Sequence, residues 1–231
     1  MKNYKYLIFD LDDTLLDFQD TERKSLEIIF NKYNIPFEEE SIMKYKTINK
    51  NLWNQLEKGF ITKDDVLSQR FEQFFKLYGY EVQGKTIERE YRNCLNIGHK
   101  LIPGAIKTLT DLKNQGFIIF AGTNGVVETQ RQRLNDSKLI SYFDDIFISE
   151  EIGFEKPNSE FFKAIFDKHI SVTKENTLMI GDSLSSDIQG AINYGLDSIW
   201  FNPSKQKESS IRPTYEIKDL SEILLILNHK K

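Results

Sequence analysis

The sequence predicts an α/β fold in which a parallel sheet flanked by helices is interrupted by an inserted all-helical domain. Two changes of pattern along the chain predict this class. From about residue 20 to 98, apolar residues recur at helical spacing and strand candidates are few. After Pro103-Gly104, short runs rich in β-branched and aromatic residues alternate with helical patterns. Such alternation is typical of a parallel sheet with helices packed on it.

The first strand is expected at Tyr4 to Phe9, far in sequence from the other strand candidates. A single strand has no hydrogen-bonding partner, so it must join the sheet that the later strands form. We therefore expect residues 1–16 and 100–231 to form one core, and residues 17–99 to form a helical insert between its two parts.

Three helices are predicted in the insert from the spacing of apolar residues. They cover Thr21 to Tyr33, Ile42 to Glu57 and Asp64 to Tyr78. Thr62, followed three positions later by Asp65, forms a plausible cap before the third helix.

The later part of the chain contains the other predicted elements of the core. The polar stretch Pro203 to Pro213 is expected to be an exposed loop before the last elements. The predicted strands are Phe117 to Ala121, Ile146 to Ser149, Thr177 to Ile180 and Ser198 to Phe201, and the helices between them include Ala105 to Lys113, Glu160 to Asp167 and Asp187 to Tyr194.

Composition indicates the setting in which the protein works. A chain of 231 residues is long enough for a core domain with an insert, and a net charge of −4 spread over both signs marks neither a binder of nucleic acid polymers nor a membrane-surface protein. Cys94 is the lone cysteine, which excludes an internal disulfide framework. No apolar run is long enough to span a membrane, and Met1 to Lys5 lead directly into the first strand. We expect a cytoplasmic protein.

Two acidic residues follow the first strand directly. Asp10 and Asp12 lie two positions apart, so side-chain alternation sends them to the same side of the strand end. Like charges in a poorly solvated site raise each other's pKa unless a cation lies between them. The pair therefore predicts a shared proton or a hard metal ion, although an acidic turn after a core strand would also explain it.

The other strand ends carry polar groups too. Gly122-Thr123-Asn124-Gly125 follows the second strand, Lys156 follows the third, and Gly181-Asp182 through Asp187 follow the fourth. Each has a structural explanation by itself: a tight turn, a surface lysine or a helix cap. Ligands of parallel α/β sheets lie at the carboxyl ends of the strands, so four polar strand ends together favour a functional site.

These motifs resemble those of the haloacid dehalogenase superfamily over nearly the whole chain. The first motif is Asp10-Leu11-Asp12-Asp13-Thr14, the second ends at Thr123, the third is Lys156 and the fourth is Gly181-Asp182 through Asp187. The resemblance implies a Rossmann-like core, a mobile helical cap, Mg²⁺ as cofactor and, most often, hydrolysis of phosphate monoesters.

A more specific likeness concerns one branch of that superfamily. Thr123-Asn124-Gly125 and Trp200-Phe201-Asn202-Pro203 are similar to motifs of cytosolic 5′-nucleotidases that act on pyrimidine and non-standard nucleoside monophosphates. The implied substrate is a small-molecule phosphate monoester, with a nucleotide as the first choice.

The chemistry of phosphate esters explains the residue types. Asp10 is expected to attack phosphorus and form an aspartyl-phosphate, and Asp12 to act as general acid and then general base. Mg²⁺ would be held by the carboxylates of Asp10 and Asp182 and the backbone carbonyl of Asp12. The phosphate-binding residues would be Thr123, Asn124 and Lys156, with Asp187 positioning Lys156 or a metal-bound water.

Several other functions share this fold. A dehalogenase needs neither the acid Asp12 nor the metal ligand Asp182, whereas a phosphomutase would use the same residues and exclude water. A non-catalytic phosphate-binding protein would not need every catalytic position filled. The nearest alternative is a phosphatase of sugar phosphates or phosphoglycolate.

Substrate selection is expected to reside in the insert. Phe60 lies at a break between two predicted helices and could stack on a base, although packing within the insert would also explain it. Arg70, Arg89 and Arg92 are available to a polar leaving group, although arginines at helical positions are more often solvated.

Overall fold

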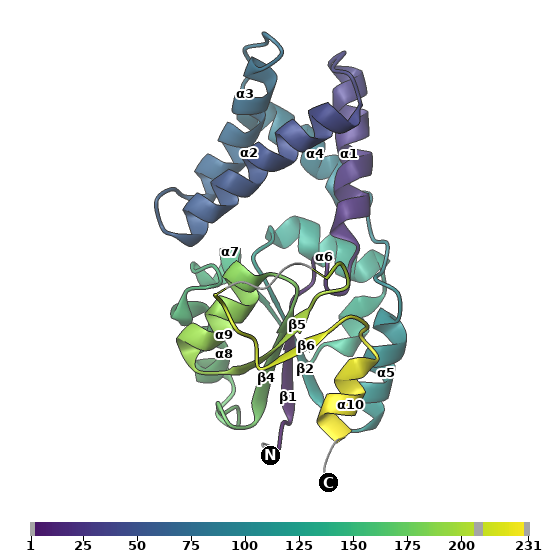
Figure 1. The fold of residues 1–231 in the computed structure, drawn as a ribbon, viewed down its shortest axis with the longest axis vertical. Coiled ribbons are helices and arrows are strands. Elements are labelled where there is room, and N and C mark those ends of the chain that lie inside the picture. Colours follow the sequence, from purple (N-terminus) through teal and green to yellow (C-terminus); the bar gives the residue numbers. More distant parts are fainter. Residues whose placement is uncertain (1–2, 206–209, 229–231) are drawn as a thin grey trace. The chain divides into compact units, whose positions relative to one another are not determined.

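The computed structural model describes residues 3–205 and 210–228, and the chain divides into two compact units (Figure 1). The core unit comprises the described residues up to Asp17 and from His99 onward, and the cap unit comprises Phe18–Gly98. The described strands all belong to the core unit, whereas the cap unit is built from helices.

The core unit contains one six-stranded parallel sheet. Its strands are β1 (Tyr6–Phe9), β2 (Ile118–Thr123), β3 (Asp145–Ile148), β4 (Thr177–Gly181), β5 (Asp197–Phe201) and β6 (Tyr215–Ile217). They are arranged in the order β3-β2-β1-β4-β5-β6. β1 lies inside the sheet, where Tyr6 is opposite Ile118 of β2 and Thr177 of β4. The predicted α/β fold is confirmed, and the first strand joins the later strands as expected.

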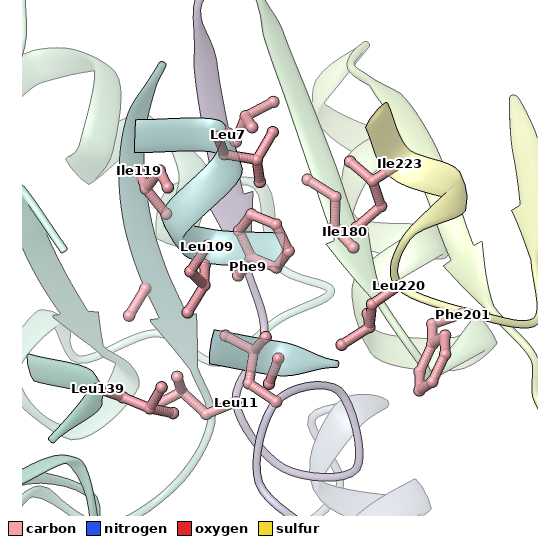
Figure 2. Packing of buried hydrophobic residues seen from close by; sticks show 14 of the residues in the cluster. Leu7, Phe9, Leu11, Leu109, Ile119, Leu139, Ile180, Phe201, Leu220 and Ile223 are labelled. Atoms are coloured by element: carbon pink, nitrogen blue, oxygen red, sulfur yellow. The ribbon is translucent and has the colours of Figure 1, made fainter. Parts of the chain in front are cut away.

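The central strand is buried on both faces, as expected for a parallel sheet covered by helices. Leu7 and Phe9 pack into one apolar cluster, and Tyr6 and Ile8 pack into another on the opposite face. Figure 2 shows the first cluster, in which Leu7 and Phe9 lie among side chains from neighbouring strands and helices. The alternating burial places Asp10, the next residue, at the carboxyl end of a strand that has no solvent-facing side.

Helices cover both faces of this sheet. α5 and α10 contribute Leu109 and Ile223 to the first cluster, and α8 and α9 contribute Phe161 and Ala191 to the second (Figure 1). The helices of the core unit are α5 (Ala105–Asn114), α6 (Val127–Asp136), α7 (Ser149–Ile152), α8 (Ser159–Lys168), α9 (Gln189–Tyr194) and α10 (Glu222–Asn228), with a 3₁₀ segment η1 (Leu139–Tyr142) and a π-helical segment η2 (Leu184–Ile188).

Two parts of the core unit differ from the sequence-based expectation. The helix expected to begin at Asp187 begins earlier, as η2, and continues as α9. The short strand β6 was not predicted, and it follows the polar stretch Pro203 to Pro213. Residues 206–209 of that stretch lie outside the described residues.

The cap unit is a bundle held by aromatic side chains. Its helices are α1 (Phe18–Lys32), α2 (Glu39–Glu57), α3 (Lys63–Lys76) and α4 (Gly84–Ile97). Phe30 of α1 stacks on Phe74 of α3, with 4.7 Å between ring centroids, and Tyr45 of α2 meets the same ring edge-on. Tyr91 of α4 contacts Phe71 at 5.1 Å. The three predicted helices are confirmed with slightly different ends, and α4 is a fourth.

The predicted N-cap of helix α3 is also confirmed. The backbone N–H of Asp65 donates to Thr62 Oγ1 at 3.2 Å, and the backbone N–H of Thr62 donates to Asp65 Oδ2 at 2.9 Å. Two donors at the helix start, which have no partner within the helix, are thereby satisfied.

Within residues 3–205 and 210–228, none of the helices has the length and apolar character needed to cross a membrane.

The capping pair gives a testable expectation for stability. Thr62→Ala should lower the free energy of unfolding by about 1 kcal/mol, because removal of the Thr62 hydroxyl leaves the backbone N–H of Asp65 without its acceptor at the start of α3. Urea titration followed by circular dichroism measures it. Thr47→Ala, an exposed threonine in the middle of α2, is the matched control and should change little. Equal losses in the two variants would contradict a specific capping role.

Candidate active site

The predicted site residues of the core unit lie at the carboxyl edge of the parallel sheet. Asp10 follows β1, Thr123 ends β2, and Asp182 follows β4. Lys156 lies in the segment between α7 and α8. The hydrogen bonds described below connect these segments, so residues more than a hundred positions apart in sequence form one cluster.

Lys156 is the centre of this cluster. It is fully buried, and its Nζ donates to Asp10 Oδ1, Asp187 Oδ1 and the Gly122 carbonyl, each at 2.6 Å. Three acceptors use all three hydrogens of the ammonium group. Burial by itself would lower the pKa of Lys156, but the carboxylates of Asp10 and Asp187 raise it above its ordinary value. The lysine is therefore a fixed positive charge, not the solvated surface lysine of the structural alternative.

The backbone of Lys156 is held by the loop after β2. Asn124 Oδ1 accepts from the backbone N–H of Lys156, and Asn124 Nδ2 donates to its carbonyl, both at 2.8 Å. This two-way contact uses the amide oxygen and one of the two amide hydrogens of Asn124. The contact positions Lys156, and the phosphate-binding role of Asn124 stays a prediction.

Asp187 is placed by the π-helical segment η2. Its Oδ2 accepts from the backbone N–H of Ser183 at 3.0 Å while its Oδ1 accepts from Lys156. A Cβ atom at Gly181 would lie 2.2 Å from Asp187 Oδ2, so a side chain there would displace the carboxylate. The glycine of the fourth motif thus makes room for the acid six positions later.

Three carboxylates lie near this one lysine, which pairs directly with two of them, Asp10 and Asp187. Burial raises the pKa of Asp10 to about 8, and the nearby Asp187 and Asp12 add to the shift although Lys156 opposes it. Burial, together with Asp187 and Asp10, also raises the pKa of Asp182 well above its usual range. The cluster is therefore short of positive charge.

Those carboxylates have the geometry of a cation site. One oxygen each of Asp10, Asp182 and Asp187 lies within 4.8 Å of the others. An all-oxygen set of acidic ligands suits a hard divalent ion such as Mg²⁺. Trp200 Nε1 donates to the Asp182 carbonyl at 2.8 Å and so anchors the backbone of one potential ligand. The grouping includes Asp187, which sequence reasoning had placed behind the metal ligands.

Asp12 has a different partner from Asp10. Arg133 Nη1 donates to Asp12 Oδ1, and Gln130 Nε2 donates to Asp12 Oδ2 at 2.8 Å. Each of the two neighbouring carboxylates contacts its own buried cation, Lys156 for Asp10 and Arg133 for Asp12. The hard metal ion expected beside this pair stays a prediction.

The same glutamine contacts the predicted phosphate-binding threonine. Gln130 Nε2 donates to Thr123 Oγ1 at 2.8 Å, and the backbone N–H of Gly125 donates to the same oxygen at 3.1 Å. With two donors on its oxygen, the Thr123 hydroxyl keeps its own hydrogen for a further acceptor. This arrangement suits a hydroxyl that donates to an anion.

Gln130 and Arg133 were missed by sequence reasoning, although a signal exists. In α6 the buried residues Thr129, Gln130, Arg133 and Leu134 recur at helical spacing, and three of them are polar. A helix that directly follows a predicted phosphate-binding motif and has a polar inner face must satisfy those polar groups inside the protein.

The two predicted specificity residues lie in the cap unit and behave differently. Phe60, between α2 and α3, is 75% exposed, so the alternative in which it packs inside the insert is wrong. Arg70 is 3% exposed, and its Nε and Nη2 donate to Glu88 Oε2 at 2.8 and 2.5 Å. The expectation of an arginine available to a leaving group is wrong for Arg70, because Glu88 occupies its guanidinium.

Comparison with known proteins identifies relatives over the full length of the chain. The family model described as haloacid dehalogenase-like hydrolase matches residues 7–201. Pyrimidine 5′-nucleotidase PynA of Streptococcus pneumoniae is 36% identical, with 96% of this chain and 94% of that protein covered. Pyrimidine 5′-nucleotidase YjjG of Escherichia coli is 32% identical, with 97% and 98% covered.

A solved structure also resembles the chain closely. The HAD-hydrolase YfnB of Bacillus subtilis is 46% identical, with 99% of this chain and 97% of that protein covered. Its crystal structure bound to magnesium matches with a TM-score of 0.93 and covers 98% of this chain and 100% of that one. More distant relatives include glyceraldehyde 3-phosphate phosphatases, such as that of Pyrococcus furiosus, which is 27% identical.

The buried lysine predicts a large effect on stability. Lys156→Met should lower the free energy of unfolding by about 3–5 kcal/mol in EDTA, because it leaves Asp10 and Asp187 buried without their shared cation. Lys163→Met, in an exposed pair with Asp167, is the control and should leave stability nearly unchanged. Urea denaturation of both variants measures the difference. Similar small effects in both would show that Lys156 is not the charge that holds the site.

Proposed function

This chain belongs to the haloacid dehalogenase-like hydrolases, and from that membership and its site geometry we propose that it is a magnesium-dependent phosphate monoester hydrolase. One observation carries the proposal. Asp10 and Asp12, two positions apart, contact different buried cations, so one carboxylate is free to serve as nucleophile and the other as acid and base.

The proposed reaction has two steps. In the first, an Asp10 carboxylate oxygen bonds to phosphorus, the ester P–O bond breaks, and Asp12 gives its proton to the departing alkoxide. In the second, a water molecule bonds to phosphorus and gives a proton to Asp12, and the bond between phosphorus and Asp10 breaks. Inorganic phosphate leaves, Asp10 is again a carboxylate and Asp12 is again protonated.

Other residues of the site bind the phosphoryl group. Lys156 supplies a fixed positive charge beside the attacking oxygen, and the Thr123 hydroxyl donates its remaining hydrogen to a phosphoryl oxygen. Asp10, Asp182 and the Asp12 backbone carbonyl would hold Mg²⁺, with Asp187 close enough to be a further ligand or to orient a metal-bound water. When bound, the ion would neutralise phosphoryl oxygens that otherwise repel the Asp10 carboxylate.

The proposed substrate class is a nucleoside 5′-monophosphate, with pyrimidine, deoxy and modified-base forms ahead of sugar phosphates. Support comes from PynA and YjjG, both pyrimidine 5′-nucleotidases, and from the nucleotidase-like motifs at Thr123-Asn124-Gly125 and Trp200 to Pro203. The alternative is a sugar-phosphate or phosphoglycolate phosphatase with the same mechanism, and the more distant relatives favour it. Dehalogenation is disfavoured, because it leaves Asp12 and Asp182 without a role.

Metal and nucleophile can be tested together. Hydrolysis of p-nitrophenyl phosphate should disappear in excess EDTA and return with Mg²⁺, because the phosphoryl oxygens must be neutralised before the Asp10 carboxylate can attack a phosphate dianion. Asp10→Asn should stay inactive in Mg²⁺, because the amide is a poor nucleophile. Asp167→Asn, on the exposed surface of α8, is the matched control and should keep full activity. Full turnover in EDTA, or by Asp10→Asn, would refute the mechanism.

Substrate class can be tested with a panel of phosphate esters and one cap variant. Phe60→Ala should weaken kcat/KM for nucleotides by the equivalent of about 1–3 kcal/mol if the ring stacks on a base, and leave p-nitrophenyl phosphate nearly unchanged. Leu77→Ala, another exposed apolar side chain of the cap unit, is the control. If sugar phosphates or phosphoglycolate exceed every nucleotide in kcat/KM, the nucleotidase assignment is wrong and the phosphatase mechanism remains.

A further inference from the structure

We propose that Gln130 and Arg133 of α6 are positioning residues that hold the Asp12 carboxyl group in line for proton transfer and join it to the phosphate-binding Thr123. The inference rests on the proposed function, in which Asp12 is the general acid and base. It assigns a role to two residues outside the four sequence motifs.

Asp12 is anchored through both of its carboxylate oxygens. Arg133 donates to Oδ1 and Gln130 donates to Oδ2, so the plane of the carboxyl group is set by two separate donors. Arg133 is fully buried and Gln130 is 1% exposed, whereas the Asp12 side chain is 29% exposed. The donors are thus fixed inside the core unit while the acid keeps a face toward solvent, where a substrate can approach.

The orientation of the Gln130 amide is set by its neighbours. Its Oε1 accepts from Arg133 Nη1 at 3.1 Å, so its Nε2 must be the end that donates to Asp12 and Thr123. A Cβ atom at Gly125 would lie 2.5 Å from Gln130 Cγ and Nε2, so the amide packs directly against the Gly125 backbone. One side chain therefore connects the acid to the phosphate-binding loop.

Stability alone does not account for this arrangement. A buried arginine and its carboxylate are commonly no more stabilising than apolar side chains of similar volume, because both charges must be desolvated. This part of α6 does bury apolar side chains, since Leu134, next to Arg133 in the sequence, is fully buried in the core cluster. A role in positioning Asp12 explains why polar groups occupy the position.

The two residues should affect different parts of the reaction. Arg133 contacts Asp12 directly and Thr123 only through Gln130, so its loss should slow proton transfer more than it disturbs Thr123. Gln130 also contacts Thr123, so its loss should additionally lower kcat/KM for every phosphate ester. Proton donation matters most for poor leaving groups, since a nitrophenolate departs without a proton and an alkoxide does not. The dependence of rate on the leaving group therefore reports on Asp12.

The experiment measures kcat/KM for a series from p-nitrophenyl phosphate through phenyl phosphate to an alkyl phosphate, in excess Mg²⁺. The variants are Arg133→Met, Arg133→Lys and Gln130→Met, with Asp12→Ala as the reference. Arg131→Met and Gln132→Met make the same chemical changes on the exposed side of α6 and serve as matched controls. Thermal unfolding of each variant shows whether it is folded.

Arg133→Met should lower kcat/KM for the alkyl ester by about ten- to a hundredfold, within the roughly 10²- to 10⁴-fold that general acid–base catalysis supplies, and change the nitrophenyl ester far less. The slope of log kcat/KM against leaving-group pKa should therefore steepen, as in Asp12→Ala. Arg133→Lys should lie between wild type and Arg133→Met. Gln130→Met should steepen the slope and also lower kcat/KM for all esters. The controls should match wild type.

The double variant Asp12→Ala/Arg133→Met gives the strictest test. Its slope should equal that of Asp12→Ala, because an absent acid cannot be positioned. If Arg133→Met and Gln130→Met lower kcat/KM equally for all esters while Asp12→Ala steepens the slope, the residues are structural and the inference fails with the proposed function intact. If Asp12→Ala itself leaves the slope unchanged, the acid–base role in the proposed function is wrong, and the inference falls with it. Should Arg133→Met not fold, Arg133→Lys and Gln130→Met decide the question by the same slopes.

Discussion

The organisation of the core unit depends on the hydrogen bonds and ion pairs of the buried Lys156 ammonium group. A charge with no exposure to solvent is tolerated only when its hydrogens meet acceptors and its charge meets opposite charge. The acceptors come from Asp10 after β1, Gly122 in β2 and Asp187 in η2. For these groups to meet, three segments of the sheet must end at the same edge, and Gly181 must lack a side chain.

The same geometry resolves the problem posed by two acids so close in sequence. Asp10 contacts Lys156 inside the site, whereas Asp12 contacts Arg133 on the inner face of α6. Separate cations give the two carboxylates separate environments, and distinct environments allow neighbouring carboxyl groups to take different chemical roles. α6 is therefore part of the site, not only a helix that covers the sheet.

The charge of the site and the packing of the cap unit support different parts of the proposed function. One lysine beside three carboxylates, of which Asp10 and Asp187 are buried and Asp182 is half-buried, leaves a deficit of positive charge, which is the physical basis for proposing Mg²⁺. In the cap unit, the guanidinium of Arg70 is buried and paired with Glu88, whereas the ring of Phe60 is exposed and is the side chain proposed to recognise a base. Reaction type and substrate choice thus rest on separate observations and can fail separately.

The sequence by itself determined the parallel α/β fold, the helical character of the insert and the polar strand ends, because these depend on local periodicity and on the rule that ligands of such sheets lie at the carboxyl ends of strands. It could not place Gln130, Arg133 or Arg70. Their partners lie up to 121 positions away, and a polar side chain in a helix has the same local pattern whether it faces solvent or a buried carboxylate. Only the tertiary structure decided that Asp12 and Asp10 would have different cations, since that choice depends on which face of α6 packs against the end of β1.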